Sequence, residues 1–196
     1  MKSGKVRIIG GEWRRRGLSF PAVDALRPTP DAVRETLFNW LMPYIFGRHC
    51  LDLYAGSGAL AFEAVSRGAA AAVMVEKNAR AATALKQNCE MIGAQNKISV
   101  TRCSAMDYLS TTDKHFDLIF LDPPFAGNEL EKACYQIEKH GLIAPSGLIY
   151  LEHARDVQAK SGLTLPASWQ KIKAAQRGAV AFALYQNSGA AVDQEV

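Results

Sequence analysis

The chain has 196 residues, of which 48% are hydrophobic and 21% are charged, the balance of a soluble protein with enough apolar residues for one sizeable core. No apolar run reaches the roughly 18 residues that a transmembrane helix needs, and the basic N-terminal segment lacks the apolar stretch of a secretory signal. We therefore predict a cytoplasmic protein without a membrane-spanning helix.

The net charge of +4 is concentrated at one end of the chain. Residues 1–16 contain six Lys and Arg residues and one Glu, whereas the rest of the chain carries a net charge of −1. This asymmetry favours a polyanionic partner, although N-terminal charge can also serve only solubility.

The four cysteines, Cys50, Cys89, Cys103 and Cys134, lie far apart and form no CxxC pair or Cys/His cluster. We expect them to be small core residues, with no disulfide in a reducing compartment and no metal site.

The first predicted elements are two short strands, "KVRIIGG" and "EWRRRGLSF", joined at Gly10–Gly11. They predict a basic β-hairpin arm within residues 1–26, ahead of a main domain over 27–187 and a flexible tail over 188–196. In "LRPTPDAVRETLFNWL", apolar residues recur at helical spacing, with Thr29 as the candidate N-cap and Pro30 at the first helical position.

From residue 50 onward, strands alternate with helices. Strands are predicted over 50–55, 71–76, 97–103, 116–122 and 147–153, helices over 59–68, 78–93 and 129–141, and a final antiparallel hairpin around Arg177–Gly178. This alternation predicts an α/β fold with a mostly parallel sheet covered on both faces, which binds ligands beyond the carboxyl ends of its strands.

The first strand of this series runs into a glycine-rich turn, "LDLYAGSGAL". Gly56 and Gly58 let a ligand approach the backbone, but the turn is not the G-x-G-x-x-G dinucleotide pattern, and no Lys-Ser/Thr pair marks a phosphate loop. Glu76 ends the next strand, 20 residues after Gly56, where an acid can accept both hydroxyls of a ribose. Ser104–Ala105 follow the third strand, where an adenine would lie.

The strand "FDLIFLD" ends in "DPPF", which is Asp122, Pro123, Pro124 and Phe125. The carboxylate and backbone carbonyls offer hydrogen-bond acceptors, the prolines stiffen the loop, and Phe125 supplies a ring for stacking. Acceptors beside a ring suit a nucleobase with an exocyclic amine.

These motifs resemble a known family. "DPPF" is similar to the fourth motif of amino-methyltransferases that use S-adenosylmethionine, and "RPTPDAVRETLFNWL", "LDLYAGSGALAFEAVSRGA" and "GLIYLEH" resemble the RsmD family of bacterial 16S rRNA (guanine-N2)-methyltransferases. The resemblance runs from about Val6 to about Gln186. It implies a Rossmann-like class I methyltransferase fold, a seven-stranded sheet with an antiparallel last strand, and guanine 966 of 16S rRNA as the substrate.

The resemblance also suggests roles for residues. The expected cofactor contacts are Asp52, Tyr54, Ala55, Gly56, Ser57, Gly58, Glu76, Lys77, Ser104 and Ala105. The expected catalytic clamp is Asp122, Pro123, Pro124 and Phe125. The expected RNA contacts are Arg7, Arg14, Arg15, Arg16, Arg27, Thr29 and Arg34. We expect no metal and a monomer that acts on 16S rRNA in a partly or fully assembled small subunit.

Two alternatives remain open at this point. The clamp does not distinguish guanine N2 from adenine N6, so an adenine-N6 methyltransferase acting on DNA or RNA fits the same motif. A non-catalytic rRNA-binding assembly factor is the other alternative, against which the complete "DPPF", the glycine turn and Glu76 argue.

Overall fold

A computed structural model of the protein describes residues 3–22, 29–124, 128–155 and 163–189. Its strands are β1 (Ser3–Arg7), β2 (Gly17–Pro21), β3 (His49–Asp52), β4 (Ala71–Val75), β5 (Ile98–Thr101), β6 (Phe116–Leu121), β7 (Ile143–Ala154), β8 (Trp169–Arg177) and β9 (Val180–Asn187). Its helices are α1 (Asp31–Leu41), α2 (Ala59–Ser66), α3 (Ala79–Ile92), α4 (Ala105–Thr111) and α5 (Glu129–Lys139).

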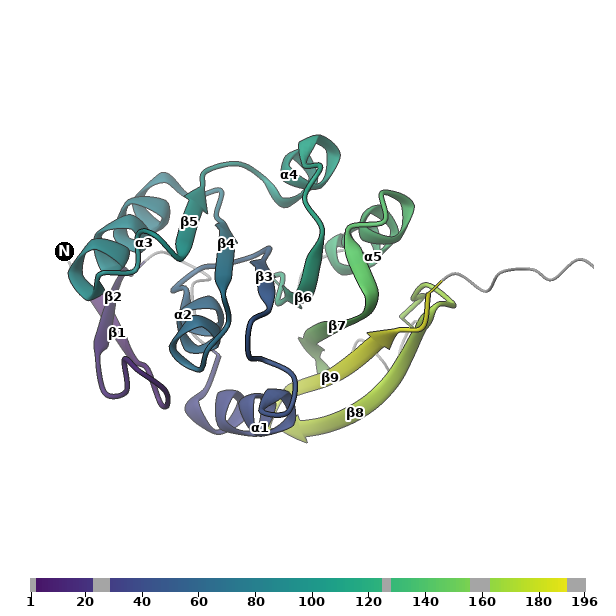
Figure 1. Cartoon of the computed structure of the whole chain (residues 1–196), viewed down its shortest axis with the longest axis horizontal. Helices are drawn as coiled ribbons and strands as arrows, with labels where there is room; N and C mark the ends of the chain where they lie inside the picture. The colour runs from purple at the N-terminus through teal and green to yellow at the C-terminus, as the bar shows by residue number, and fades with distance from the viewer. Residues whose placement is uncertain (1–2, 23–28, 125–127, 156–162, 190–196) are drawn as a thin grey trace, which may run out of the picture.

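Seven strands form one sheet in the order β5-β4-β3-β6-β7-β9-β8 (Figure 1). Strands β3 to β7 pair in parallel, and β9 runs antiparallel to both of its neighbours. The predicted α/β fold, with a mostly parallel sheet and a reversed last strand, is confirmed.

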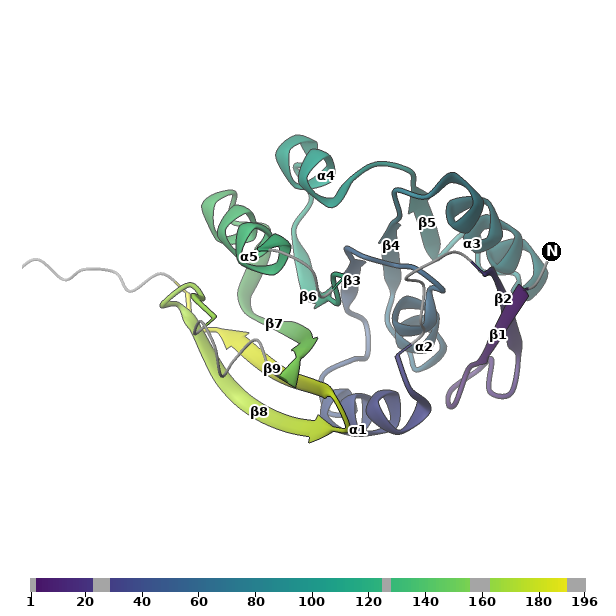
Figure 2. The same cartoon turned by 180° about the vertical axis from the view of Figure 1, so that it is seen from behind.

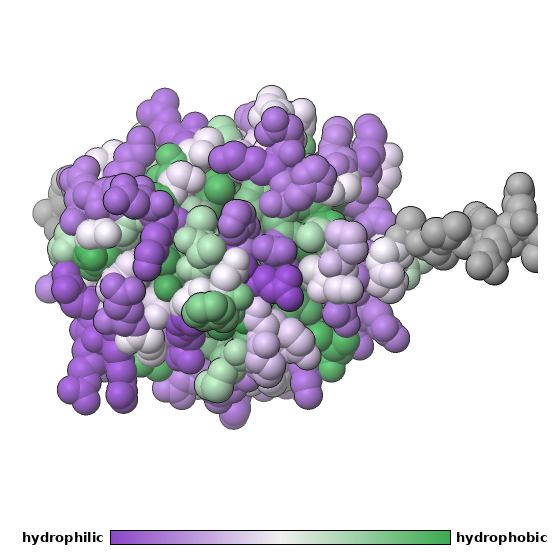
Figure 3. Space-filling view, viewed as in Figure 1, coloured by the Kyte–Doolittle hydropathy of each residue, from purple (hydrophilic) through white to green (hydrophobic). Residues whose placement is uncertain are grey.

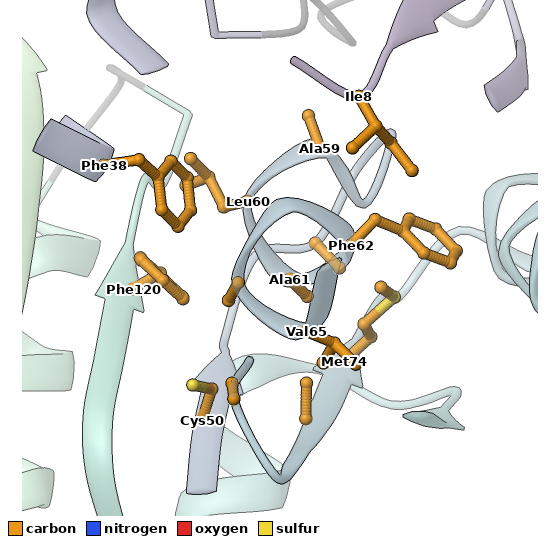
Figure 4. Packing of buried hydrophobic residues seen from close by; sticks show 14 of the residues in the cluster. Ile8, Phe38, Cys50, Ala59, Leu60, Ala61, Phe62, Val65, Met74 and Phe120 are labelled. Atoms are coloured by element: carbon orange, nitrogen blue, oxygen red, sulfur yellow. The ribbon is translucent and has the colours of Figure 1, made fainter. Parts of the chain in front are cut away.

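Helices cover both faces of the sheet (Figures 1 and 2). Side chains of α1, α2, α3 and the β1–β2 hairpin join one core cluster, and those of α4 and α5 join a second cluster on the other face. Helix α2 is the most enclosed, since all eight of its residues are buried. Figure 4 shows it surrounded by Ile8 of the hairpin, Phe38 of α1 and Met74 of β4. Helix α2 therefore packs against the hairpin, α1 and β4.

The β1–β2 hairpin packs against the domain instead of projecting from it. Its apolar residues share the core of the main domain: Val6, Ile8, Trp13, Leu18 and Phe20. Its connection is also hydrogen-bonded to α2, because the amides of Ile9 and Gly10 each donate to the Glu63 carboxylate at 2.8 Å.

The structure corrects four local predictions. The strand expected to begin at Glu12 begins at Gly17, because the chain turns over residues 11–15 while Glu12 and Trp13 hydrogen-bond to Ser66. Helix α4 was not expected, since seven residues show little periodicity. Strand β7 begins four residues earlier than predicted, at Ile143.

The fourth correction concerns the start of α1. Pro30 occupies the N-cap position, and no side chain caps the helix, so the N-cap predicted at Thr29 is wrong. By contrast, Asn78 caps α3 as predicted, accepting from the amides of Arg80 and Ala81, and Gly93 ends it in the left-handed conformation. In the ranges described, none of the helices combines the length and apolarity needed to cross a membrane.

Candidate active site

Three neighbouring strands carry an acidic residue at the same edge of the sheet. Asp52 ends β3, Asp122 directly follows β6, and Glu152 lies near the end of β7. The register pairs Leu121 with Leu151, which places Asp122 and Glu152 side by side at the carboxyl ends of adjacent strands. This edge is where open parallel sheets bind their ligands.

The glycine turn lies between β3 and α2 at this edge. Gly58 has a φ of +77°, and a Cβ there would come within 2.6 Å of Leu85 Cδ2, so neither the backbone nor the packing admits a larger residue. Gly56 also has a positive φ, of +52°. The turn therefore needs glycine for its backbone conformation, and Gly58 packs closely against Leu85.

Glu76 is held against this turn. One carboxylate oxygen accepts the amide of Gly56 at 2.9 Å, and the other accepts the amide of Asn78 at 2.7 Å. These bonds fix the orientation of the carboxylate and leave lone pairs on both oxygens. The structure thus brings together the two features expected of a ribose site.

The other expected cofactor residues differ in how well they fit. Ala55 and Ser57 are buried in the turn, and Lys77 is exposed beside Glu76. The side chain of Tyr54 packs with the core cluster on the α4 and α5 face, so only its backbone belongs to the turn. Ala105 is the first residue of α4.

Ser104 has a local role that the sequence did not reveal. Its hydroxyl caps α4, accepting the amide of Asp107 at 3.1 Å and donating to the Asp107 carboxylate at 2.7 Å. A contact from Ser104 to an adenine would have to compete with these bonds, and its backbone is the better candidate.

Asp122 is half-buried, and its Oδ2 accepts a hydrogen bond from the Thr29 hydroxyl at 3.3 Å. Burial raises the pKa of Asp122 to about 6, and the bond from Thr29 opposes this rise. Pro123 is buried and Pro124 is exposed. Phe125, the predicted stacking residue, lies outside the described residues.

The two acids beside Asp122 are also perturbed. Burial raises the pKa of Asp52 to about 7, opposed by the Ala61 amide, which donates to its carboxylate at 3.3 Å. Burial and the nearby Asp122 raise the pKa of Glu152 to about 8, although the Tyr150 hydroxyl donates to it at 2.8 Å. Perturbed acids that meet at a strand edge make this edge the candidate site.

Glu152 was missed from the sequence, although a glutamate inside the apolar run "LIYLEH" was a usable signal. The described residues hold no group of three His, Cys, Asp or Glu side chains suited to a metal ion, at this edge or elsewhere.

A basic groove leads toward this site. It encloses about 610 Å³ and is lined by Lys5, Val6, Arg7, Arg15, Gly17, Thr29, Pro30 and Asp31. Arg7, Arg14, Arg15 and Arg16 are exposed, and in Figure 3 hydrophilic side chains cover the hairpin side of the molecule. Arg16 donates to the Met91 carbonyl at 2.9 Å, so part of its hydrogen-bonding capacity is already used within the protein. Arg27 lies outside the described residues.

Arg34 does not belong to this basic surface, contrary to the expectation from sequence. Its side chain is 0% exposed and pairs with Asp31 at 2.6 Å and with the buried Glu63 at 3.6 Å. The helical phase of α1 turns Arg34 inward, beside Val33 and Leu37, so it cannot reach a phosphate.

Comparisons with known proteins show the family to which this chain belongs. Residues 6–186 match the family model described as Conserved hypothetical protein 95. Ribosomal RNA small subunit methyltransferase D of Escherichia coli strain K12 is 43% identical over 94% of this chain and 91% of its own length. The protein of that name from Haemophilus influenzae is 42% identical, over 94% and 95% respectively.

Solved structures show the same likeness. The Escherichia coli protein yhhF superimposes with a TM-score of 0.85 at 40% identity, covering 95% of this chain and 99% of that one. The Thermus protein TTHA0928 gives a TM-score of 0.73 at 32% identity, covering 91% and 98%. The chain therefore belongs to the Conserved hypothetical protein 95 family, the RsmD family whose motifs its sequence carries.

Proposed function

We propose that this protein transfers a methyl group from S-adenosylmethionine to the exocyclic N2 of a guanine in 16S rRNA, guanine 966 by family resemblance, during maturation of the small ribosomal subunit. The observation that carries the proposal is the position of the half-buried Asp122 carboxylate. Asp122 follows β6, which is next to β3 and the glycine turn that follows β3, and Glu76 follows β4 on the other side of β3. The curated relatives support the rRNA substrate through their names.

The cofactor part of the site uses the turn and Glu76. The half-buried backbone of Gly56 lies beside the cofactor, and the preoriented Glu76 carboxylate accepts the hydroxyls of its ribose. Bound S-adenosylmethionine supplies an electrophilic methyl group, and this chain supplies the position and the electrostatic environment.

The substrate part uses Asp122 and Pro123. The lone pair of guanine N2 is delocalised into the ring, which makes N2 a weak nucleophile. Hydrogen bonds from the amine to the Asp122 carboxylate and the Pro123 carbonyl favour a tetrahedral nitrogen. The lone pair is then free to attack the methyl group of the cofactor. Positioning and preorganised charge supply most of the acceleration. The ionised Asp122 is also placed to take the proton that the methylated nitrogen loses.

The RNA surface consists of the basic groove and the exposed arginines of the hairpin. Lys5, Arg7 and Arg15 suit the phosphates that flank the target nucleotide. The target base must leave its stack, and Phe125 is proposed to hold it. We further propose that the protein acts as a cytoplasmic monomer on a partly or fully assembled subunit.

The direct test is mass spectrometry of nucleosides from 16S rRNA incubated with the protein and labelled cofactor. N2-methylguanine is the expected product. N6-methyladenine would instead assign the clamp to an adenine substrate. RNA binding without methyl transfer, together with no cofactor binding in calorimetry, would indicate an assembly factor.

Replacing Glu76 by Ala should weaken cofactor binding by about 1.5–3 kcal/mol, the usual scale for a hydrogen bond to a charged group. Titration calorimetry with S-adenosylmethionine measures this change. Glu90→Ala is the matched control, since Glu90 is exposed on the neighbouring helix α3 and should leave the affinity unchanged. An equal affinity in both variants would remove Glu76 from the site.

Replacing Arg7 and Arg15 by Gln should weaken RNA binding and leave cofactor affinity unchanged. The slope of log K against log salt should shrink by about 0.7–0.9 for each phosphate that the protein no longer neutralises. The double variant Lys114→Gln, Lys139→Gln removes the same charge from exposed positions near α4 and α5 and should keep the wild-type slope. If both double variants reduce the slope equally, the hairpin contributes only net charge.

A further inference from the structure

Thr29 stands where the sequence places a helix cap, yet its hydroxyl is used elsewhere. Pro30 takes the N-cap position of α1, with φ −55° and ψ 145°, and no side chain caps the helix. Thr29 is only 6% exposed, and its Oγ1 lies 3.3 Å from Asp122 Oδ2, a residue 93 positions further along the chain. The hydroxyl therefore joins the segment before α1 to the proposed clamp.

This bond is the one hydrogen bond made to the Asp122 side chain by the part of the chain that the structure describes. The titratable groups that face Asp122 from neighbouring strands are Asp52 on β3, and Glu152 and Tyr150 on β7. Each of these becomes negative when it ionises, so each opposes a charge on Asp122. Thr29 supplies the donor that favours the ionised carboxylate.

We propose that Thr29 is a positioning residue for the reaction, whose hydroxyl holds Asp122 Oδ2 and thereby turns Oδ1 toward the substrate amine. The inference rests on the proposed function of Asp122. It also explains why Thr29 lines the basic groove, because the RNA strand in that groove would pass the residue that orients the clamp. Thr29 thus acts through Asp122, whereas the sequence predicted an RNA contact for it.

The bond has a defined effect on ionisation. Burial already raises the pKa of Asp122 to about 6, and a hydroxyl that donates to the carboxylate lowers it. Removing the hydroxyl leaves burial unopposed, so the pKa must rise further. A smaller fraction of Asp122 is then ionised at any given pH near neutrality. The acidic limb of the pH–rate profile for methyl transfer therefore moves to higher pH.

The closing experiment measures Asp122 itself, in the full chain without cofactor or RNA. Carboxyl carbon chemical shifts of aspartate-labelled protein are titrated against pH, and Asp122→Asn assigns the signal. In Thr29→Val the Asp122 midpoint should move upward, and in Thr29→Ser it should return toward the wild-type value. Thr36→Val is the matched control, because the Thr36 hydroxyl donates to the Ala32 carbonyl within α1.

Single-turnover methyl transfer gives the second readout. Near pH 6, Thr29→Val should be roughly tenfold slower than wild type, the scale of one hydrogen bond to a charged group, and the gap should narrow toward about pH 9. Thr29→Ser should stay within about threefold of wild type. Cofactor affinity should be equal in all variants.

An unchanged Asp122 midpoint in Thr29→Val, or a midpoint that Thr29→Ser fails to restore, would overturn the proposal. The titration needs no turnover, so this outcome differs from a failure of the proposed function. A shifted midpoint in a protein that methylates no RNA would show that Thr29 orients Asp122 but would refute its role in the reaction.

Discussion

Asp122→Ala should bind S-adenosylmethionine normally and transfer methyl groups at a rate lower by about 10²–10³, the loss seen when one preorganised polar contact to a transition state is removed. Asp122 makes no hydrogen bond to the glycine turn or to Glu76 within the described residues, so the ribose site should survive. In the proposed mechanism the carboxylate instead stabilises the positive charge that develops on the amine nitrogen. Single-turnover assays on 16S rRNA, beside cofactor titration by calorimetry, separate these two effects.

Asp113→Ala is the control for this variant, because Asp113 is an exposed acid in the loop between α4 and β6. It should retain the wild-type rate. A near-normal methyl-transfer rate in Asp122→Ala would contradict the clamp mechanism. Loss of cofactor binding in Asp122→Ala would instead place its carboxylate in the cofactor part of the site.

Glu63→Ala should lower the free energy of unfolding by about 3–5 kcal/mol, the cost of removing one partner of a buried ion pair. Glu63 is 0% exposed and joins three parts of the fold. It accepts the amides of Ile9 and Gly10 from the hairpin, pairs with Arg67 of its own helix end at 2.7 Å, and lies 3.6 Å from Arg34 on α1. Its loss leaves the buried Arg34 guanidinium with Asp31 as its one ion-pair partner among the described residues.

Urea denaturation of Glu63→Ala measures the loss, and hydrogen exchange at Ile9 and Gly10 tests whether the hairpin connection detaches first. Glu35→Ala is the matched control, since Glu35 is an exposed acid on α1 and should change stability by less than about 0.5 kcal/mol. A loss below about 1 kcal/mol in Glu63→Ala would mean that the network contributes little to stability.

Much of the fold followed from local patterns. The alternation of apolar strands and amphipathic helices predicted the parallel sheet, and the last hairpin was recognised from its turn at Arg177–Gly178. The closeness of the glycine turn and Glu76 was also predictable, because Gly56, Gly58 and Glu76 lie within one strand–helix–strand unit. In such a unit the connections are short and right-handed, so chain order alone places the glycine turn beside the next strand end.

The substrate part was only partly predictable. "DPPF" identifies Asp122 as a candidate by its chemistry, but no sequence pattern pairs it with Thr29 or sets it beside Glu152. The N-cap assigned to Thr29 was a reasonable local choice that a tertiary contact overrode. A hydroxyl that donates to a half-buried carboxylate stabilises its charge, and the chain path that ends at Pro30 places Thr29 for that bond.

The sequence by itself determined the order of elements, the sheet that they build, the glycine turn with Glu76 and the acidic end of β6, because each depends on residues close together in the chain. Tertiary structure alone decided which basic residues line the groove and which are buried in the core. From sequence, Arg7 and Arg34 were both expected to contact RNA. In the structure, Arg7 lines an open groove and Arg34 is buried against Glu63. That difference arises because the hairpin packs on α2, and a guanidinium enclosed there is stable only beside a carboxylate from another element.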